Sequence, residues 1–378
     1  MKYDLLLKGG KVVDKASNID RCMDIGVTGE IIADVKPNLN PLETRQVLDV
    51  SGFIVAPGLI DLHAHAFLEA KELGQETDPT CLSSGVTTMV DGGSTGAATF
   101  EGFKEFLIDR AEIRLLAFLH ISSIGLADLL VGESTYLPLL NPQRTAEMAR
   151  KYPGLILGIK VRQQKEAVGN NGLEPLRLAK QAAFLAGSLP TMVHVTNPPV
   201  PLSQILELLE PGDIVTHFLH GRGMGILNDD KRVSAYAREA RQRGIVFDVG
   251  HGRNHLNFSV ARRALDEGFL PDTISTDLTR QGKAGVARNL LHCLSKFLNL
   301  GMDLPSVLAC ATTNPARIMN MEGVIGTLRE GTCADIAVLS LEPGEFVFED
   351  CDGNTLRGQH RLSPQYTIRQ GRLIWQHE

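Results

Sequence analysis

Six side chains that can bind a divalent cation stand at the ends of predicted strands in this 378-residue sequence. They are His63, His65, Lys160, His194, His217 and Asp277. Side chains alternate between the two faces of a strand, so His63 and His65 can point the same way and reach one cation. Imidazole suits zinc and similar metals, and Asp277 supplies a hard oxygen ligand or a proton acceptor. The set therefore predicts a metal site that activates water for hydrolysis.

The elements that must position these residues alternate regularly along the middle of the chain. Eight short β-rich apolar runs are predicted as strands, at 59–65, 87–92, 115–121, 155–161, 191–196, 214–219, 245–249 and 273–277. Helical periodicity between them predicts helices at 100–109, 173–186, 202–209, 231–242, 260–267 and 287–300. This alternation predicts a parallel (β/α)8 barrel of the TIM type, an α/β fold whose active sites form at the carboxyl ends of the strands. The six candidate ligands lie at those ends.

The two ends of the chain predict short strands instead. They cover 4–14, 24–35 and 45–54 near the N-terminus, and 335–341, 346–349 and 366–375 near the C-terminus, with a hairpin turn at Gly371. We therefore expect a small β-sandwich domain built from residues 1–55 and 321–378. It flanks a hydrolase barrel that covers residues 56–320.

Lys160 is the unusual member of the set, because the run Gly158-Ile-Lys-Val161 places an amine in an apolar strand where a charge is costly to bury. Taken alone, it fits a lysine that snorkels to solvent or a salt-bridge partner. An ammonium next to two cations would be repelled. An amine that has reacted with carbon dioxide is instead a carbamate, whose two oxygens can bridge a pair of metals.

Composition narrows the class of protein. The chain has 38 basic and 44 acidic side chains and a net charge of −6, without a basic stripe, so nucleic acid is not an expected partner. Asp4 and Lys8 interrupt the first apolar run and no stretch reaches transmembrane length, so we expect neither a signal peptide nor a membrane partner. Six dispersed cysteines without a C-x-x-C pair indicate a cytoplasmic protein with reduced thiols. A small acylated molecule is the expected partner, and the sequence does not decide between a monomer and a homo-oligomer.

Motifs along essentially the whole chain resemble the amidohydrolase superfamily, and within it the deacetylase-like, dihydroorotase-related branch. The resemblance rests on LLKGGKVVD (6–14), PGLIDLHAH (57–65), GVTTMVD (85–91), GIK (158–160), VHVTN (193–197), TH (216–217), STD (275–277), TNPAR (313–317) and GTLREGTCADIAVL (326–339). Each motif alone is weak, whereas the set together is specific.

The resemblance implies a barrel with two divalent metal ions, usually zinc, bridged by a carboxylated lysine and by hydroxide. Carried onto this chain, it assigns His63, His65 and Asp277 to the inner metal, His194 and His217 to the outer metal, and the carbamate on Lys160 to the bridge. Two cations lower the pKa of the bridging water, and Asp277 would take its proton and pass it to the leaving group. Manganese, iron and cobalt fit the same residue types.

Three further residues are candidates for contact with the substrate. Arg162 lies two residues beyond Lys160, so strand alternation aims it at the same face, where it could stabilise the oxyanion. The resemblance supports this catalytic role, and a surface arginine is the alternative. His251 lies between two glycines after the seventh strand, and Asn197 lies near the end of the fifth; both are expected to contact the substrate.

Three functions remain open at this stage. The leading one is a hydrolase that removes an acetyl or other small acyl group from a small N-acyl or O-acyl metabolite. The second is a cyclic amide hydrolase of the hydantoinase, allantoinase or dihydroorotase type. Phe67 replaces the arginine that dihydroorotases usually carry, and no cysteine falls near the metal set, so dihydroorotase and cysteine-bridged aminoacylase chemistry fit poorly. The third is a binding or scaffold protein that has kept the barrel and lost its metal. Such proteins typically lose metal ligands, whereas all six candidate ligands are present in this chain.

Overall fold

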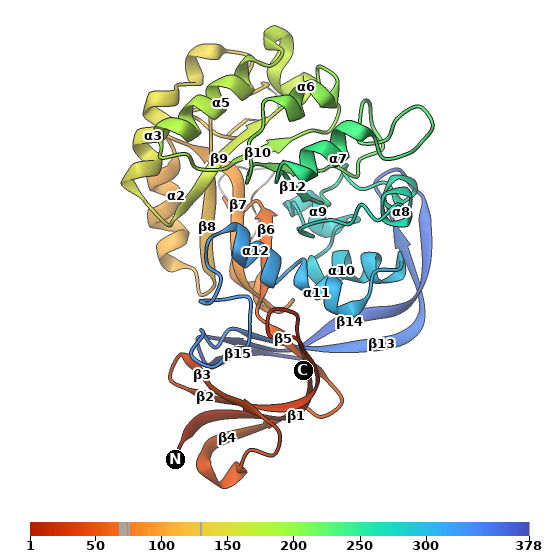
Figure 1. Ribbon diagram of the computed structural model, residues 1–378. Helices are drawn as coiled ribbons and strands as arrows, with labels where there is room; N and C mark the ends of the chain where they lie inside the picture. The colour runs from red at the N-terminus through yellow and green to blue at the C-terminus, as the bar shows by residue number, and fades with distance from the viewer. Residues whose placement is uncertain (68–73, 75, 129–130, 378) are drawn as a thin grey trace.

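The computed structural model describes residues 1–67, 74, 76–128 and 131–377, and it contains two sheets that lie next to each other (Figure 1). One sheet is parallel, comes from the middle of the chain and is surrounded by helices. The other consists of strands from the two ends of the chain. The predicted fold class, an α/β barrel beside a small β domain built from both termini, is therefore confirmed.

The barrel sheet contains seven parallel strands in the described part of the chain, each paired with the next in sequence. They are β6 (Leu59–Ala64), β7 (Val86–Gly96), β8 (Arg114–His120), β9 (Ile156–Arg162), β10 (Thr191–His194), β11 (Ile214–Thr216) and β12 (Val246–Asp248). The eighth predicted run, 273–277, joins β12 to β6 by backbone hydrogen bonds. Val249 N donates to Thr273 O at 3.0 Å, and Asp277 N donates to His63 O at 2.6 Å. Isolated bridges pair Thr273 with Asp248 and Leu278 with Ala64, so this segment pairs with its neighbours at two points and not as a continuous strand.

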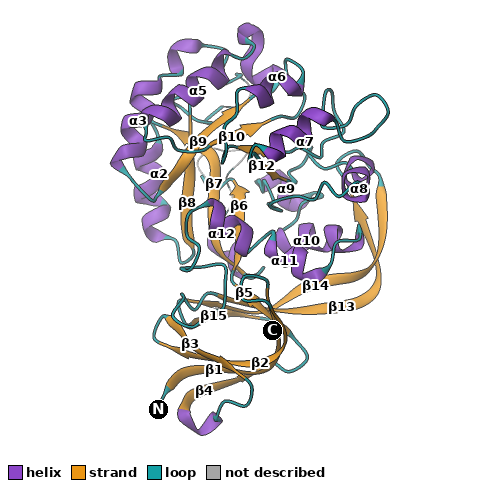
Figure 2. Cartoon of the chain, viewed as in Figure 1, coloured by secondary structure: helices purple, strands orange, loops and turns teal. Residues whose placement is uncertain are grey.

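Helices cover the outside of the barrel (Figure 2). The described helices are α1 (Thr77–Leu82), α2 (Phe100–Phe106), α3 (Pro142–Lys151), α4 (Lys165–Val168), α5 (Glu174–Leu185), α6 (Leu202–Glu207), α7 (Ala235–Gln242), α8 (Phe258–Asp266), α9 (Arg280–Ala284), α10 (Leu290–Asn299), α11 (Leu304–Ala309) and α12 (Thr313–Ile318), with short 3-10 turns at 41–43, 108–110, 137–139 and 169–171. Asn257 caps α8 by accepting a hydrogen bond from Val260 N, so this helix starts two residues before its predicted start. None of these helices is long and apolar enough to cross a membrane.

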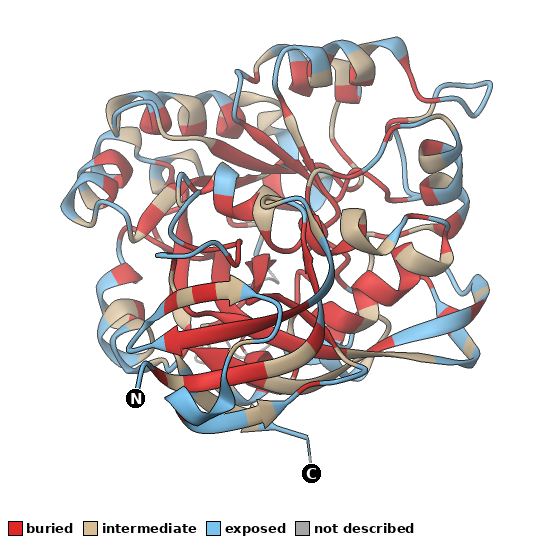
Figure 3. Ribbon diagram, turned by 60° about the horizontal axis from the view of Figure 1, so that its bottom comes forward, coloured by how far each residue is buried: buried red, intermediate tan, exposed pale blue. Residues whose placement is uncertain are grey.

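The terminal sheet is one hydrogen-bonded sheet. Its strands are β1 (Tyr3–Asp14), β2 (Ile19–Thr28), β3 (Ile31–Lys36), β4 (Thr44–Asp49), β5 (Ile54–Pro57), β13 (Ile336–Glu349), β14 (Thr355–Arg369) and β15 (Arg372–Gln376). The order is β15-β14-β13-β5-β1-β2-β3, with β4 paired to β1. Strand β5 contacts β1 on one side and β13 on the other, which joins the two ends of the chain. A separate apolar core that includes Leu7, Ile25 and Ile336 packs on this sheet, and Figure 3 shows buried, intermediate and exposed stretches along its strands.

Strands β13 and β14 form a hairpin that is much longer than the predicted strands. Residues 336–339 of β13 are buried in the sheet, whereas the half near the turn is mostly exposed. Within that half the predicted strand at 346–349 contains Phe348, which is buried in the apolar core, whereas residues 343–345 are exposed and carry no apolar pattern. In Figure 1 the hairpin leaves the terminal sheet and rises along the side of the barrel to α8.

Candidate metal centre and active site

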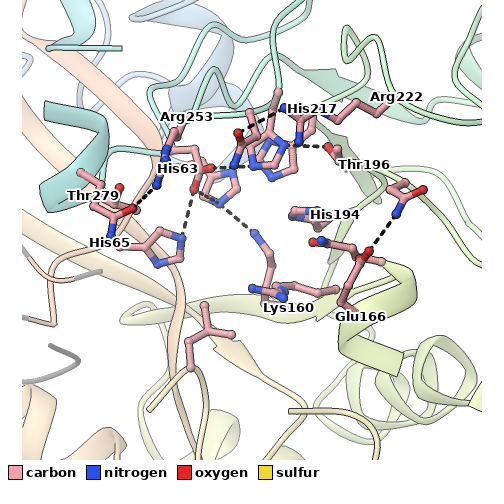
Figure 4. Close-up of a pocket in the computed structure, with 18 residues that line it drawn as sticks. His63, His65, Lys160, Glu166, His194, Thr196, His217, Arg222, Arg253 and Thr279 are labelled. Carbon is pink, nitrogen blue, oxygen red and sulfur yellow. Dashed lines mark hydrogen bonds and ion pairs between the residues drawn. The ribbon is translucent and has the colours of Figure 1, made fainter. Parts of the chain in front are cut away.

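A cavity of about 540 Å³ opens at the carboxyl ends of the barrel strands (Figure 4). Among the described residues its lining is polar except for Leu126. The lining includes all six predicted metal ligands: His63, His65, Lys160, His194, His217 and Asp277. The fold therefore brings together side chains that are as much as 214 residues apart in the sequence, from His63 to Asp277.

The first group of candidate ligands consists of His63 and His65, at the end of β6, and Asp277, at the end of the segment that closes the barrel. His63 Nε2 lies 3.4 Å from Asp277 Oδ1, and His65 Nε2 lies 3.1 Å from the same oxygen. All three side chains are buried. As strand alternation predicts, both rings point into the same cavity.

The proton on the His63 ring is fixed by a chain of hydrogen bonds behind it. Thr216 Oγ1 donates its one hydrogen to Asp248 Oδ2 at 2.7 Å. The same hydroxyl lies 2.9 Å from His63 Nδ1, so it must accept a hydrogen bond from that nitrogen. His63 is therefore protonated at Nδ1 and carries a lone pair on Nε2, toward the cavity.

His65 is fixed in the same way by Ser94. Ser94 Oγ donates to Asp91 Oδ2 at 2.7 Å and lies 2.8 Å from His65 Nδ1, from which it accepts. The unprotonated Nε2 atoms of His63 and His65 thus face a carboxylate oxygen of Asp277. Both nitrogens and the oxygen are hydrogen-bond acceptors, so none of them can donate to another. Acceptor atoms that converge in this way, oriented from behind by hydroxyl and carboxylate groups, match the usual design of a metal site.

The second group of candidate ligands consists of His194, His217 and His255, whose ligating atoms all lie within 4.8 Å of one another. His217 Nδ1 donates to Gly250 O at 2.6 Å, which leaves a lone pair on Nε2. His194 Nε2 is buried and has no hydrogen-bond partner in the described part of the chain. A buried nitrogen without a partner is costly, and a metal ion would satisfy it.

Sequence reasoning missed His255. It follows β12, and its ring centroid lies 4.0 Å from that of His217. Its Nε2 lies 3.5 Å from Asp277 Oδ2. The run Gly250-His-Gly-Arg-Asn-His255 holds two histidines, and the flanking glycines were the signal for a tight turn. Both glycines adopt positive φ, at 47° and 52°, and the turn brings the second histidine into the cavity.

His251, which was predicted to contact the substrate, lies outside the cavity lining and is fully buried. Its Nε2 accepts a hydrogen bond from Lys296 Nζ at 2.7 Å, and its Nδ1 donates to Gly252 O at 2.9 Å. The prediction that this side chain faces the substrate therefore has to be corrected. The chain turns at the glycines, so the cavity-lining positions of this loop begin at Arg253 instead.

Lys160 lies wholly inside the barrel, where its Nζ donates to His63 Nε2 at 2.8 Å and contacts Met192 Sδ at 3.5 Å. Burial lowers the pKa of this amine to about 8. No described ion pair includes Lys160, so neither snorkelling nor a salt bridge explains its position. Gly93 makes room for it, because a Cβ atom at that glycine would lie 2.5 Å from Lys160 Cγ.

Arg162 reaches the same cavity as Lys160, and a buried glutamate holds it there. Arg162 Nε lies 3.0 Å from Glu133 Oε1, and His120 Nε2 lies 3.5 Å from the same oxygen. Burial alone would raise the pKa of Glu133, but the Arg162 guanidinium and His120 bring it below its ordinary value. Glu133 is therefore an ionised partner of Arg162, and it was not predicted from the sequence.

The outer part of the cavity is lined by amides and arginines. Asn197, a predicted substrate contact, lies in the lining and donates to Glu166 Oε1 at 3.0 Å. Arg222 and Arg253 also line the cavity, on the loops that follow β11 and β12, and were not predicted (Figure 4). The site therefore combines an inner histidine cluster with an outer polar rim.

Comparison with known proteins agrees with this geometry. The sequence profile of the amidohydrolase family matches residues 218–374. A protein of Agrobacterium fabrum named a deacetylase is 32% identical over 91% of this chain and 84% of its own length. A solved structure described as an adenine deaminase is 30% identical, covers 99% of this chain and 100% of its own, and has a TM-score of 0.93. A second, described as a dihydroorotase, is 31% identical over 98% and 97% of the two chains, with a TM-score of 0.90.

Proposed function

Because the chain belongs to the amidohydrolase family and is a hydrolytic enzyme, we propose that it removes an acetyl or other small acyl group from a small N-acyl or O-acyl metabolite. The relative from Agrobacterium fabrum that is named a deacetylase supports this choice. The observation that carries the proposal is the convergence of unprotonated Nε2 atoms of His63 and His65 on Asp277 at the base of a polar cavity.

The proposal includes two divalent metal ions, with zinc as the first choice because histidine dominates the ligand set. His63, His65 and Asp277 would hold the inner ion, and His194 and His217 the outer ion. Lys160, as a carbamate, would bridge them. When bound, the ions would polarise the scissile carbonyl and make water acidic enough to react at neutral pH.

Asp277 is the residue to which we assign proton transfer. As water adds to the carbonyl carbon, one of its protons passes to the Asp277 carboxylate. The same proton then moves to the leaving nitrogen or oxygen while the C–N or C–O bond breaks. The products are the free carboxylic acid and the amine or alcohol, and Asp277 returns to its ionised form.

Arg162 is the residue to which we assign stabilisation of the oxyanion. Its Nε forms an ion pair with Glu133 Oε1 at 3.0 Å, and its side chain lines the cavity. A fixed cation at this place costs no reorganisation as charge develops on the carbonyl oxygen. Asn197 and the rim arginines would orient the polar part of the substrate.

Cyclic amide hydrolysis is the second candidate, and the solved structure described as a dihydroorotase favours it. The position that carries arginine in dihydroorotases is Phe67 here. Its ring packs edge-on against Phe103, with centroids 5.6 Å apart, and it does not line the cavity. The residue that grips a substrate carboxylate in dihydroorotases is therefore replaced by a packing residue.

A substrate comparison separates the two candidates. Metal-loaded protein would be given N-acetyl amino acids, O-acetyl hydroxy acids, hydantoin and dihydroorotate under the same conditions. Deacylation with a larger kcat/KM than ring opening is the expected result. Faster ring opening would replace the deacylase proposal with the cyclic amide hydrolase.

We also infer a cytoplasmic location. All six cysteines are unpaired in the structure, as in proteins of a reducing compartment. Fractionation of the source cells with an antibody to the chain would test this, and recovery outside the cytoplasm would contradict it.

A further inference from the structure

The buried lysine Lys296, on α10, connects three segments that are distant in the sequence. Its side chain is fully buried, and its Nζ has three acceptors, each at 2.7 Å: His251 Nε2, Val286 O and Glu349 O. An ammonium group has three hydrogens, so all of them are used. Lys296 thus ties the start of the loop after β12 to the end of β13.

The turn of the β13–β14 hairpin, residues 350–354, continues this connection. Cys351 N donates to Leu256 O at 3.0 Å, and Asp350 Oδ2 accepts from Phe258 N at 2.8 Å. Asp352 Oδ2 accepts from Asn257 Nδ2 at 2.7 Å. The hairpin turn therefore binds the far end of the same loop that Lys296 binds at its start.

The loop held in this way carries part of the cavity lining. Arg253, Asn254 and His255 all face the cavity, and the loop is bound on both sides of them. Arg222, from the loop after β11, also lines the cavity; its Nε lies 3.8 Å from Asp352 Oδ1 and its Nη2 donates to Asn254 Oδ1 at 3.4 Å. Asp352 thus contacts both loops that form this side of the rim.

We propose that the β13–β14 hairpin turn is a positioning element of the active site, in which Asp352 and Lys296 hold residues 250–257 and Arg222 against the cavity and so set how tightly substrate binds. A strand pair of the terminal domain thereby takes part in substrate binding without touching the substrate. This inference rests on the proposed function of the cavity for its kinetic consequence and on the contacts above for its structural one.

Asp352→Ala is the direct test, with Glu345→Ala as the matched control on an exposed part of the same hairpin. Hydrogen exchange of the amides at 250–257 should rise about tenfold in Asp352→Ala, because the hydrogen bond to Asn257 and the ion pair to Arg222 are lost. The KM for N-acetylalanine should rise about fivefold while kcat stays within about twofold, since the six residues that we assign to the two ions lie outside 250–257. Glu345→Ala should match the unmodified protein in both measurements, and Asp352→Glu should recover part of the loss.

Unchanged exchange at 250–257 together with an unchanged KM in Asp352→Ala would overturn the inference. A general rise in exchange over the whole barrel, with kcat and KM altered together, would also overturn it, because that pattern indicates simple destabilisation. Lys296→Met supplies a second variant, in which exchange should rise at 250–257 and at 286 and 349. If the unmodified protein hydrolyses neither N-acetylalanine nor 4-nitrophenyl acetate, the proposed function is wrong, and the exchange data still decide the inference.

Discussion

At the scale of single residues, the serine and threonine behind the histidines matter as much as the histidines themselves. Ser94 and Thr216 each donate to a buried carboxylate and accept from an imidazole, so they determine which ring nitrogen faces the cavity. Partners of this kind orient ligands and raise their basicity.

Ser94→Ala tests that role. It removes the acceptor for His65 Nδ1 and frees the ring to rotate or to change tautomer. Zinc affinity, measured by competition with a chromogenic chelator, should fall about 10–100-fold. Ser122→Ala is the control, because the buried Ser122 hydroxyl lacks a hydrogen-bond partner among the described residues. Equal zinc affinities in the two variants would contradict the role of Ser94.

Glu133→Gln tests how Arg162 is held. The Arg162 guanidinium loses its ionised partner, so kcat should fall about 10–100-fold. If Glu133 acts through Arg162, adding Glu133→Gln to Arg162→Ala should have little further effect on kcat. Fully multiplicative effects in the double variant would show that the two residues act separately.

The sequence predicted the six candidate ligands because their types and their places at strand ends are visible without the fold. His255 and Glu133 could not be found in that way. His255 reaches the cavity through a glycine turn whose direction the sequence does not specify, and Glu133 lies in a loop, 29 residues before Arg162. His251 was the wrong choice within its loop for the same reason.

At the scale of elements, β7 and β9 approach closely where a glycine faces Lys160. Gly93→Ala should place its Cβ against Lys160 Cγ and force an unfavourable backbone at a φ of +92°. We expect a loss of about 1–3 kcal/mol of unfolding free energy, together with weaker zinc binding. Gly102→Ala, within α2 and with open space around it, is the matched control and should be neutral or stabilising by up to about 1 kcal/mol. Urea denaturation of both variants gives the comparison, and equal midpoints would contradict the close approach.

The barrel strands were predicted because burial on both faces makes them short apolar runs, and helices such as α5, α8 and α10 because one buried face produces periodicity. The β13–β14 hairpin was predicted only in part, as the short runs 335–341, 346–349 and 366–375, since many of the residues between these runs are exposed. The eighth barrel segment was predicted as a strand, but it pairs with its neighbours through isolated bridges at Thr273 and Leu278 and a few backbone hydrogen bonds.

At the scale of the whole molecule, strand–helix alternation predicted the barrel, and short strands at both ends of the chain predicted the terminal β domain. Neither pattern indicates that the terminal domain contacts the active site. The structure shows this contact in the hairpin, which runs from the terminal sheet to the loop that carries Arg253 and His255. Contacts of this kind join residues about 100 positions apart, as from His251 to Cys351. Side-chain pairs at that separation leave no periodic trace in a single sequence.

The measurement that tests the central claim most directly is metal content set against hydrolysis in one preparation. Protein stripped with a chelator and then titrated with zinc should be inactive at the start and reach full deacylase activity at about two ions per chain, the number that a two-metal centre requires. The substitution His63→Ala should abolish the recovery of activity with zinc. Full activity in metal-free protein would contradict the account.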